Sequence, residues 1–560
     1  MSKYEELWSK AYDEGVRRKV EIPDINLYQL LERTAKRYPD KKATSYFNAS
    51  LTYSQLLNQV DIFAAVLAKK GIGKGDRVAV MLPNCPQYLI SYFALARLGA
   101  IVAQTSPLYK SDELLFELQD AECKWIILLD LLYPVLSPIE KQSSLEGVIF
   151  TRVSDYFPFH LKMLYPIKQL KEGTKVKVPS RSNYYWFKSL ISQSTGTPPE
   201  VKIDPDQDVA LFQFTGGTTG RPKGAQLTHK NVVANAYQTK EWLGNDCQEG
   251  KERILDVLPL FHSYGMTTTM NLSVLIGGTL ILLPRFDLEQ VLKIIEKDKP
   301  TLFPGVPTLY VAIINHPEIG KYDLSSIKSC ISGAAPLPVE VQRRFEELTG
   351  GKLVEGYGLS EASPVTHCNP VMGRGKEGSI GIPMSNTRAS IIDVETGEEL
   401  PVGEKGELAL TGPQVMKGYW KRPEETEAVL EDGWLYTGDI ATMDEDGFFF
   451  IVDRKKDMII SGGFNVYPRE VEEVLYEHPA VKEAVVCGIS EEYHGEVVKA
   501  YIVIKEDRET SEEEIIAFCK EKLSAYKVPK EVDFRQELPK TMVGKILRRE
   551  LRKEEEESSA

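Results

Sequence analysis

Apolar stretches alternate with longer mixed stretches over the first half of the chain, an order typical of alternating strands and helices. The stretch 77–83 (RVAVMLP) is typical of a buried strand, 86–100 of a helix and 101–107 of the next strand. Strand–helix–strand order at this spacing predicts parallel strands joined by right-handed crossovers. A second series consists of a helix at 228–243 and strands at 209–214, 253–259 and 279–284. The simplest architecture is an α/β fold with two doubly wound sheets.

The pattern changes after about residue 375. Short strands separated by turn glycines, as in 389–412, predict a small antiparallel, barrel-like β unit over about 375–453. Beyond it, a helix, a strand and a second helix are typical of a small α+β unit. We therefore expect a large N-terminal domain at 1–453, a small C-terminal domain at 457–560 and a connection at 453–457.

Length and charge indicate a protein of several domains that does not bind nucleic acid. A chain of 560 residues is too long for a single core, so several domains are expected. The formal net charge of −13 argues against nucleic acid as a partner, because phosphate backbones require basic surfaces. A local basic pocket can still bind an anionic cofactor.

Cysteine spacing and hydropathy indicate the compartment. No two of the seven cysteines lie within four residues of each other, which fits neither a zinc site nor a disulfide framework. The N-terminal stretch is charged and has no apolar signal region. The apolar stretch 125–136 is interrupted by Asp130 and Pro134 and is too short to span a bilayer. We expect reduced thiols in a soluble, cytoplasmic protein.

The segment 155–191 mixes aromatic residues with lysines and contains little acid. One interpretation is a solvent-facing excursion that packs its aromatic side chains on the core. The other is peripheral contact with a membrane surface, at the inner face of the membrane. The sequence leaves both open and slightly favours the first.

The stretch 215–224 (TGGTTGRPKG) has the composition of a phosphate-binding loop. It does not fit the Walker pattern, because Lys223 follows Pro222 and precedes Gly224. It follows an apolar strand and precedes a helix that Thr228 is expected to cap. Glycine N–H groups, threonine hydroxyls and a lysine suit an anion, whereas the alternative is a flexible turn without a ligand.

Four further motifs accompany this loop: YGLSE (357–361), YTGD (436–439), DRKKDMIISGGFNVYPREVE (453–472) and PKTMVGKI (539–546). In this order they resemble the adenylate-forming acyl-CoA synthetases, whose relatives include luciferases and peptide-synthetase adenylation domains. The resemblance extends over almost the whole chain. It implies ATP, Mg²⁺ and CoA as cofactor and co-substrates, an acyl-AMP intermediate and a mobile C-terminal domain.

The resemblance also implies a nucleotide site. The 215–223 loop would hold the β- and γ-phosphates, and Tyr357 would stack on adenine opposite the 333–335 turn. Asp439 would accept hydrogen bonds from the ribose hydroxyls. The residues implied for ATP and AMP are Thr215, Gly216, Gly217, Thr218, Thr219, Gly220, Lys223, Gly333, Ala334, Ala335, Glu355, Gly356, Tyr357, Gly358, Ser360, Asp439, Arg454, Lys456 and Lys545.

Catalytic and metal-binding roles follow from the same resemblance. Glu361, with Thr215, would hold Mg²⁺, and His262 would lie beside the acyl carboxylate. Lys545 would neutralise charge between the carboxylate and the α-phosphate. Without their motifs, Glu361 is more typical of a helix cap, Asp439 of a turn residue, His262 of a structural histidine and Lys545 of one solvated charge in a basic stretch.

The two half-reactions require two positions of the C-terminal domain. The resemblance identifies 453–456 as the hinge, with Lys456 at its pivot. It also implies that Gly462, Gly463 and Phe464 line the path of the pantetheine arm of CoA.

The acid that is activated has to be inferred from the pocket. The resemblance places His262, Tyr264, Gly305, Val306 and Ala334 around the acyl group. Residues 263–266 contain no carboxylate to pair with an amine, which disfavours an amino acid. No tryptophan lies between 353 and 372 to close the pocket as in acetate-specific relatives.

The stretch 303–317 resembles bacterial long-chain fatty-acid ligases in particular. We therefore expect an AMP-forming long-chain fatty-acid–CoA ligase, with a homodimer as the general expectation for such enzymes. The alternatives are a medium-chain or aryl-acid (coumarate-like) CoA ligase, or an acyl-AMP ligase that loads a carrier protein. A luciferase and a non-enzymatic binding protein are further alternatives that the sequence disfavours.

Overall fold

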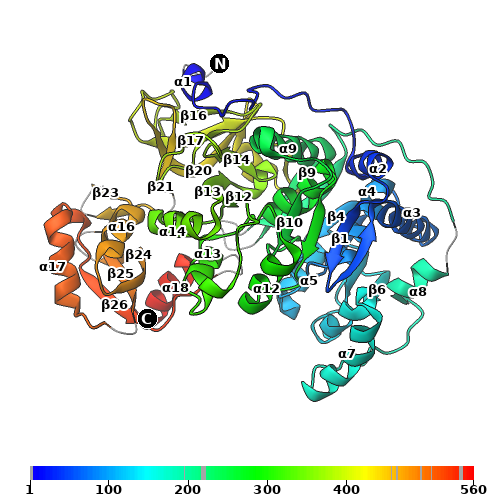
Figure 1. The fold of residues 1–560 in the computed structure, drawn as a ribbon. Coiled ribbons are helices and arrows are strands. Elements are labelled where there is room, and N and C mark those ends of the chain that lie inside the picture. The colour runs from blue at the N-terminus through cyan, green and yellow to red at the C-terminus, as the bar shows by residue number, and fades with distance from the viewer. Residues whose placement is uncertain are drawn as a thin grey trace.

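The computed structural model describes residues 4–193, 196–215, 222–455, 457–461, 464–491, 495–505, 508–540 and 546–559. The elements up to β21 form a large body, and the elements after it form a smaller one at the opposite side of the view in Figure 1. All seven cysteines are free. No helix within these ranges has both the length and the apolar character needed to cross a membrane.

The first sheet is mainly parallel, and its central strands are almost entirely buried. Its strands in spatial order are β18 (Gly418–Tyr419), β9 (Lys223–Thr228), β8 (Val209–Thr215), β4 (Ile101–Gln104), β3 (Arg77–Met81), β5 (Trp125–Leu129), β6 (Gly147–Thr151) and β7 (Tyr184–Trp186). The strands from β8 to β7 are parallel, whereas β9 and β18 are antiparallel to their neighbours. Because both faces are covered, the central strands are continuous apolar runs, which is why the sequence predicted them.

The second sheet is assembled from distant parts of the chain. One part contains β10 (Arg253–Asp256), β11 (Thr279–Leu282), β1 (Lys42–Tyr46) and β2 (Ala49–Thr52), and the other contains β12 (Ser329–Ser332), β13 (Lys352–Gly358), β14 (Val365–Cys368) and β15 (Ile382–Pro383). Isolated bridges through Leu302 connect β10 to β12. The sequence assigned the strand at 209–214 to this second series, but β8 pairs with β4 in the first sheet. Strand order along the chain does not determine which sheet a strand joins.

Helices cover both sheets. Every residue of α4 except Arg97 is buried, because α4 packs against β3 and β4 on one side and against α2 and α3 on the other. The principal helices of the large body are α2 (Leu27–Arg37), α3 (Tyr53–Lys69), α4 (Pro86–Leu98), α5 (Ser111–Asp120), α7 (Phe159–Lys171), α8 (Phe187–Ser192), α9 (His229–Trp242), α12 (Leu288–Asp298), α13 (Pro307–Ile314) and α14 (Val339–Thr349).

The expected β unit is an antiparallel sheet of five strands. Its members are β16 (Arg388–Ile392), β17 (Gly406–Thr411), β19 (Leu430–Glu431), β20 (Trp434–Met443) and β21 (Phe449–Arg454). β17, β19 and β21 all pair with β20. β20 and β21 therefore carry the YTGD motif and the start of the expected hinge side by side.

The C-terminal body has its own sheet and helices. Its strands are β22 (Ile459–Ser461), β23 (Phe464–Val466), β24 (Val481–Glu491), β25 (Gly495–Ile504) and β26 (Glu531–Arg535), and its helices are α16 (Pro468–Glu477), α17 (Glu512–Lys522) and α18 (Arg548–Ser559). Pro468 occupies the first turn of α16, where its missing N–H has no cost.

The two interpretations of 155–191 apply to different parts of the segment. Tyr156 and Phe187 are buried, and β7 extends the first sheet, so these aromatic residues pack on the core as the first interpretation expected. Helix α7, between them, has no buried residue. In Figure 1 it lies at the edge of the molecule, below α8.

Candidate active site

The predicted phosphate loop connects two antiparallel strands. Thr215, at the end of β8, pairs with Lys223, at the start of β9. The Thr228 hydroxyl accepts a hydrogen bond of 3.2 Å from the N–H of Asn231, so Thr228 caps α9 as expected. Because β9 separates the loop from α9, the loop does not stand at the start of that helix. Gly216, Gly217, Thr218, Thr219 and Gly220 lie outside the described residues.

A short chain of contacts joins this hairpin to Glu361. The Lys223 ammonium lies 5.0 Å from the centre of the Tyr419 ring. The Tyr419 hydroxyl donates a 2.8 Å hydrogen bond to Glu361 Oε1, and β18 brings Tyr419 there by pairing with β9. The backbone N–H of Met416 donates a 2.7 Å bond to the Glu361 carbonyl. The Glu361 side chain and backbone are therefore both held, next to the strands that carry the loop.

The donor set fits a magnesium ion that arrives with nucleotide. Within the described residues no three His, Cys, Asp or Glu side chains are grouped to hold a metal on their own. The Glu361 carboxylate and the Thr215 hydroxyl supply oxygen ligands only. Mg²⁺ is usually bound through one or two carboxylates together with substrate phosphates, which is the combination available here.

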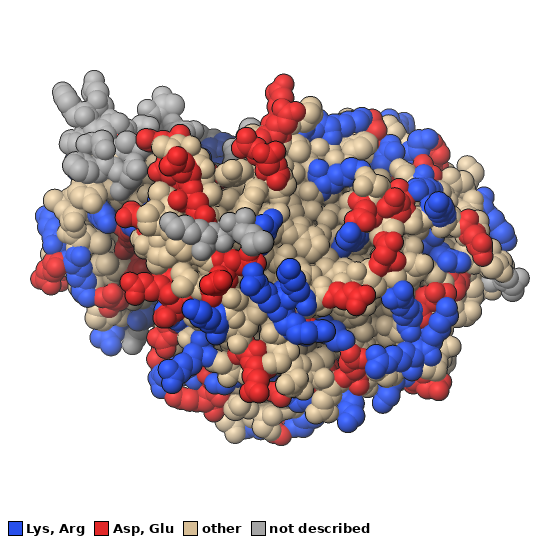
Figure 2. Space-filling view, turned by 90° about the horizontal axis from the view of Figure 1, so that it is seen from above, with Lys and Arg blue, Asp and Glu red and all other residues tan. Residues whose placement is uncertain are grey.

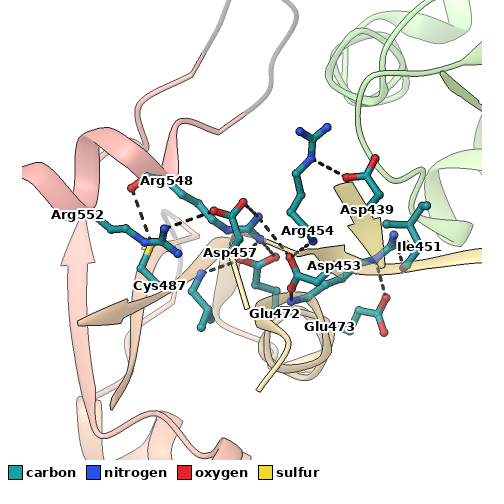
Figure 3. Close-up of polar contacts among 12 residues, drawn as sticks. Asp439, Ile451, Asp453, Arg454, Asp457, Glu472, Glu473, Cys487, Arg548 and Arg552 are labelled. Atoms are coloured by element: carbon teal, nitrogen blue, oxygen red, sulfur yellow. Dashed lines mark hydrogen bonds and ion pairs between the residues drawn. The ribbon is translucent and has the colours of Figure 1, made fainter. Parts of the chain in front are cut away.

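Three strands, β13, β20 and β21, bring Tyr357, Asp439 and Arg454 together. Asp439 on β20 is paired with Arg454 on β21, and Arg454 Nε lies 2.8 Å from Asp439 Oδ1 (Figure 3). The Tyr357 hydroxyl, from β13, donates a hydrogen bond to Asp439 Oδ2. Burial and the Asp439 carboxylate raise the pKa of Tyr357 well above its ordinary value, so its hydroxyl remains a donor. A carboxylate has about four acceptor positions, which leaves Asp439 with room for ribose hydroxyls.

The 333–335 turn lies against the acyl-pocket candidates. A Cβ atom on Gly333 would lie 3.1 Å from the Tyr264 ring, and Ala334 has a φ of 68°. The Tyr264 hydroxyl donates hydrogen bonds of 3.1 Å to the Gly305 carbonyl and 2.6 Å to the Ile331 carbonyl. Tyr264 also packs with Val306 in a small apolar cluster. The structure thus places Gly305, Val306, Tyr264 and the 333–335 turn next to one another, and their role as an acyl pocket stays a prediction.

Glu355, on β13, is buried beside Leu337, which follows this turn. Its Oε2 atom accepts a 3.1 Å hydrogen bond from the N–H of Leu337. Burial raises the pKa of Glu355 to about 7, although the Leu337 N–H and the Arg469 charge oppose the rise. Arg469 belongs to α16, so a charge of the C-terminal body limits the rise in the pKa of Glu355.

The two glycines on either side of Tyr357, Gly356 and Gly358, are required by close packing. A Cβ atom on Gly358 would lie 2.1 Å from the carbonyl oxygen of Pro364, and one on Gly356 would lie 2.9 Å from Ile331. Any side chain on Gly358 would displace backbone. These glycines therefore fix the position of Tyr357 between them.

His262 stands next to the YGLSE segment. It caps the helix that starts at Ser263, and its Nδ1 atom accepts a 3.3 Å hydrogen bond from the N–H of Tyr264. The hydroxyls of Ser263 and Ser360 are 3.4 Å apart. The helix continues with a π-helical turn over Met266–Asn271, which the sequence did not predict. The segment expected to bind the acid and the segment expected to bind nucleotide are thus in contact.

A network of ion pairs surrounds the expected hinge (Figure 3). Arg548 Nη2 lies 2.6 Å and 2.8 Å from the two carboxylate oxygens of Glu472, and Arg548 Nη1 lies 3.6 Å from Asp457 and 4.0 Å from Asp453. Arg469 donates its backbone N–H to Asp453 Oδ2 at 2.8 Å. Burial raises the pKa of Asp453 to about 6 against the effect of Arg548. The first residue of the expected hinge, Asp453, is therefore bound to the C-terminal body.

Other predicted residues cannot be placed. Lys456, Gly462, Gly463 and Lys545 lie outside the described residues, and of Phe464 only the backbone, at the start of β23, is described.

The sequence missed several residues of the site. Nothing local marks Tyr419 as a partner of Glu361. The sequence indicated no role for Arg548 and Arg552, which lie in the basic stretch after Lys545, yet both approach Asp457. Their spacing of four places both on one face of α18, and this was the signal available.

Known proteins are similar to this chain in sequence and in fold. Residues 31–420 match the family described as AMP-binding enzyme, and residues 470–545 match the AMP-binding enzyme C-terminal domain. A long-chain-fatty-acid–CoA ligase of Bacillus subtilis is 51% identical over 552 residues, 98% of this chain and 98% of the relative. A long-chain-fatty-acid–CoA ligase of Salmonella typhimurium is 40% identical over 564 residues, again 98% of each chain.

A solved structure has the same fold. The crystal structure of the anthranilate CoA ligase AuaEII in complex with anthranoyl-AMP matches with a TM-score of 0.84 at 26% identity, over 96% of this chain and 99% of that one. The expected α/β fold with a large N-terminal and a small C-terminal domain is confirmed, and so is the resemblance inferred from the motifs. The chain belongs to the family of adenylate-forming AMP-binding enzymes.

Proposed function

We propose that this protein is a long-chain fatty-acid–CoA ligase that uses ATP and CoA and releases AMP and pyrophosphate. The contact between Ser263 and Ser360 carries the proposal, because it joins the acid-binding candidates around His262 to the nucleotide-binding candidates around Glu361. A carboxylate and an α-phosphate must meet at such a junction. The 51% identity to the Bacillus subtilis ligase supports the assignment.

In the first half-reaction, a carboxylate oxygen of the acid attacks the α-phosphorus and pyrophosphate leaves. Mg²⁺ held by Glu361 and Thr215 would neutralise phosphate charge. Lys223 supplies charge at the start of β9, and Tyr419 keeps Glu361 in place. We assign Lys545 to the reacting oxygens, where an ion pair at ~4 Å and an effective dielectric of ~20 is worth roughly 4 kcal/mol.

Nucleotide binding is assigned to the Tyr357–Asp439–Arg454 group. Asp439 accepts hydrogen bonds from the ribose hydroxyls, and Arg454 neutralises Asp439 and reaches toward ribose or phosphate. The adenine ring lies between Tyr357 and the Gly333–Ala335 turn, with Glu355, Gly356, Gly358 and Ser360 around it.

In the second half-reaction, the CoA sulfur attacks the acyl carbonyl, the thiol proton is lost and AMP leaves. The domain boundaries at 453–457 and the pivot at Lys456 are part of this proposal. The network around Arg548 supports a hinge there, because it joins Asp453 to Asp457 and Glu472 across the connection. Gly462, Gly463 and Phe464 would line the pantetheine path.

The long-chain substrate rests on the pocket and on the relatives. Tyr264, Gly305, Val306 and Ala334 offer an apolar wall, since the Tyr264 hydroxyl is already bound to two backbone carbonyls. A medium-chain or aryl acid, or transfer to a carrier protein, remains the alternative for the same chemistry.

We propose a cytoplasmic enzyme that contacts the inner face of the membrane, where long-chain acids partition, and that forms a homodimer. Nucleic acid is not among its expected partners. On the face in Figure 2, acidic and basic side chains are interspersed, which gives no support to a polyanion-binding surface there.

The test is pyrophosphate release with ATP, Mg²⁺ and fatty acids of increasing length, with and without CoA. We expect CoA-dependent turnover that is fastest with long saturated acids. Adenylation without acceleration by CoA would favour the carrier-protein alternative, and activity restricted to aryl or medium-chain acids would exclude the long-chain substrate.

A further inference from the structure

Helix α7 (Phe159–Lys171) exposes an unusual amount of apolar surface. Its side chains include five of the fourteen large hydrophobic residues that are exposed in the described part of the chain. They are Phe159 (80% exposed), Met163 (63%), Leu164 (58%), Ile167 (53%) and Leu170 (63%). Single exposed apolar residues are ordinary, but such a group on one short helix indicates an interaction surface.

The exposed residues lie on one side of the helix. At ~100° per residue, the five fall within an arc of roughly 140°. Tyr165 lies opposite this arc, half-buried, and its ring contacts the Phe157 ring at 5.4 Å, edge to face. Tyr165 therefore attaches α7 to the body with the apolar side directed outward. We call this side, made of Phe159, Met163, Leu164, Ile167 and Leu170, the α7 face.

Positive charge flanks the α7 face. Lys162 and Lys168 are about 120° away from its centre, one on each side, and Lys171 lies within its edge. Lys168 is 3.8 Å from Glu172, an exposed pair that contributes little. Residues 155–191 contain six lysines and one arginine against Asp155 and Glu172, a net charge of +5 in a chain of −13. The segment thus differs in sign from the protein as a whole.

We propose that the α7 face docks the protein on an anionic lipid bilayer surface. The apolar side chains would enter the headgroup boundary while Lys162 and Lys168 extend to lipid phosphates on either side. The charge favours this occupant over a second copy of the chain, because a two-fold contact through α7 would bring two such basic segments together. The inference names the element that makes the proposed membrane contact, and it does not require ligase activity.

The experiment measures binding of the full-length protein to sedimented vesicles. Vesicles of phosphatidylglycerol are compared with vesicles of phosphatidylcholine at low salt, and the variant Met163→Ser/Leu170→Ser is compared with Met372→Ser/Val394→Ser. The control pair is matched, since Met372 and Val394 are 57% and 50% exposed but lie outside α7. No residue of α7 is buried, and Met372 and Val394 are at least half exposed, so we expect both variants to retain the fold.

We expect binding to phosphatidylglycerol vesicles that falls about tenfold or more in the α7 variant and stays unchanged in the control. Lys162→Gln/Lys168→Gln should weaken binding and reduce its salt dependence. Equal binding of the α7 variant and the unchanged protein would overturn the proposal, as would equal affinity for the two lipids. Concentration-dependent dimerisation that the α7 variant abolishes would assign the face to a second copy instead.

A parallel assay separates this proposal from the proposed function. Pyrophosphate release with a short, water-soluble acid, measured without vesicles, should be the same in the α7 variant and the unchanged protein. A protein that binds vesicles through α7 but activates no acid would contradict the ligase assignment alone.

Discussion

The guanidinium of Arg454 lies 2.8 Å from the carboxylate of Asp439, directly opposite it on the neighbouring strand. Asp439 is almost fully buried, and its second oxygen accepts the Tyr357 hydroxyl. Asp439→Asn removes the charge that holds both partners. We expect it to raise the ATP concentration for half-maximal pyrophosphate exchange by about tenfold or more, since hydrogen bonds to charged groups contribute roughly 1.5–3 kcal/mol. The exposed Glu431→Gln, on β19 of the same sheet, is the control. If the two variants required the same ATP concentration for half-maximal exchange, Asp439 would not contribute to nucleotide binding.

Tyr419→Phe removes one hydrogen bond and keeps the ring under Lys223. Glu361 then loses a partner that fixes its carboxylate. We expect the Mg²⁺ concentration for half-maximal activity to rise several-fold, with stability reduced by only about 1 kcal/mol. Tyr419→Leu, which also removes the contact with Lys223, should have the larger effect in the same titration. If neither variant changed the Mg²⁺ concentration for half-maximal activity, Glu361 would not be a ligand of the metal.

The raised pKa of Glu355 predicts how stability depends on pH. A carboxyl whose pKa rises from its ordinary value near 4.5 to about 7 on folding binds its proton more tightly in the folded state. Its contribution to stability is therefore complete below pH 4.5 and is lost as the pH rises to 7, by the order of 3 kcal/mol. Glu355→Gln keeps an acceptor for the Leu337 N–H and carries no charge. Between pH 4.5 and 7, the unfolding free energy of the unchanged protein should fall relative to that of Glu355→Gln. If the unfolding free energies of the two proteins changed with pH in parallel, burial would not raise the pKa of Glu355.

Arg548→Met removes the charge that Glu472, Asp457 and Asp453 share. Each carboxylate loses an ion-pair partner, although the Val486 N–H, Arg552 and the Arg469 N–H still contact Glu472, Asp457 and Asp453. We expect a loss of about 1.5–3 kcal/mol in unfolding experiments, the contribution of hydrogen bonds to charged groups. Arg548 also opposes the rise in the pKa of Asp453, so its removal should raise that pKa further above 6. The acid limb of the pH–activity profile should then move to higher pH. The exposed neighbour Arg549 provides the control, since Arg549→Met makes the same change of charge. If the acid limb moved equally in both variants, the change in net charge alone would explain the shift.

Gly358→Ala places a Cβ atom 2.1 Å from the Pro364 carbonyl oxygen. The backbone beside Tyr357 must move, so we expect a loss of roughly 1–3 kcal/mol and weaker nucleotide binding. Gly320→Ala is the matched control, because a Cβ atom there meets no atom within 4 Å. Denaturant unfolding of both variants measures the difference, and equal stabilities would show that the segment adapts without cost.

Local patterns predicted the elements well and their long-range partners less well. Strands β3 and β4 were predicted because both of their faces are covered, which makes their residues continuously apolar. The same pattern does not reveal which sheet a strand joins, and β8 was therefore misassigned. In the site, Asp439 and Tyr357 were identified through motifs. Tyr419 and Arg548 escaped because their importance comes from partners 58 and 76 residues away in the sequence.

Among the residues that the structure describes, no core cluster contains apolar side chains from both bodies. The clusters around Ile459 and Tyr501 contain only residues from 459 onward, and those of the large body only residues up to 451. We therefore expect each part to fold as a separate piece. Fragments divided near residue 456 should fold independently and reassemble into a split enzyme. The C-terminal body of a relative should also combine with this large body without any repacking of either core.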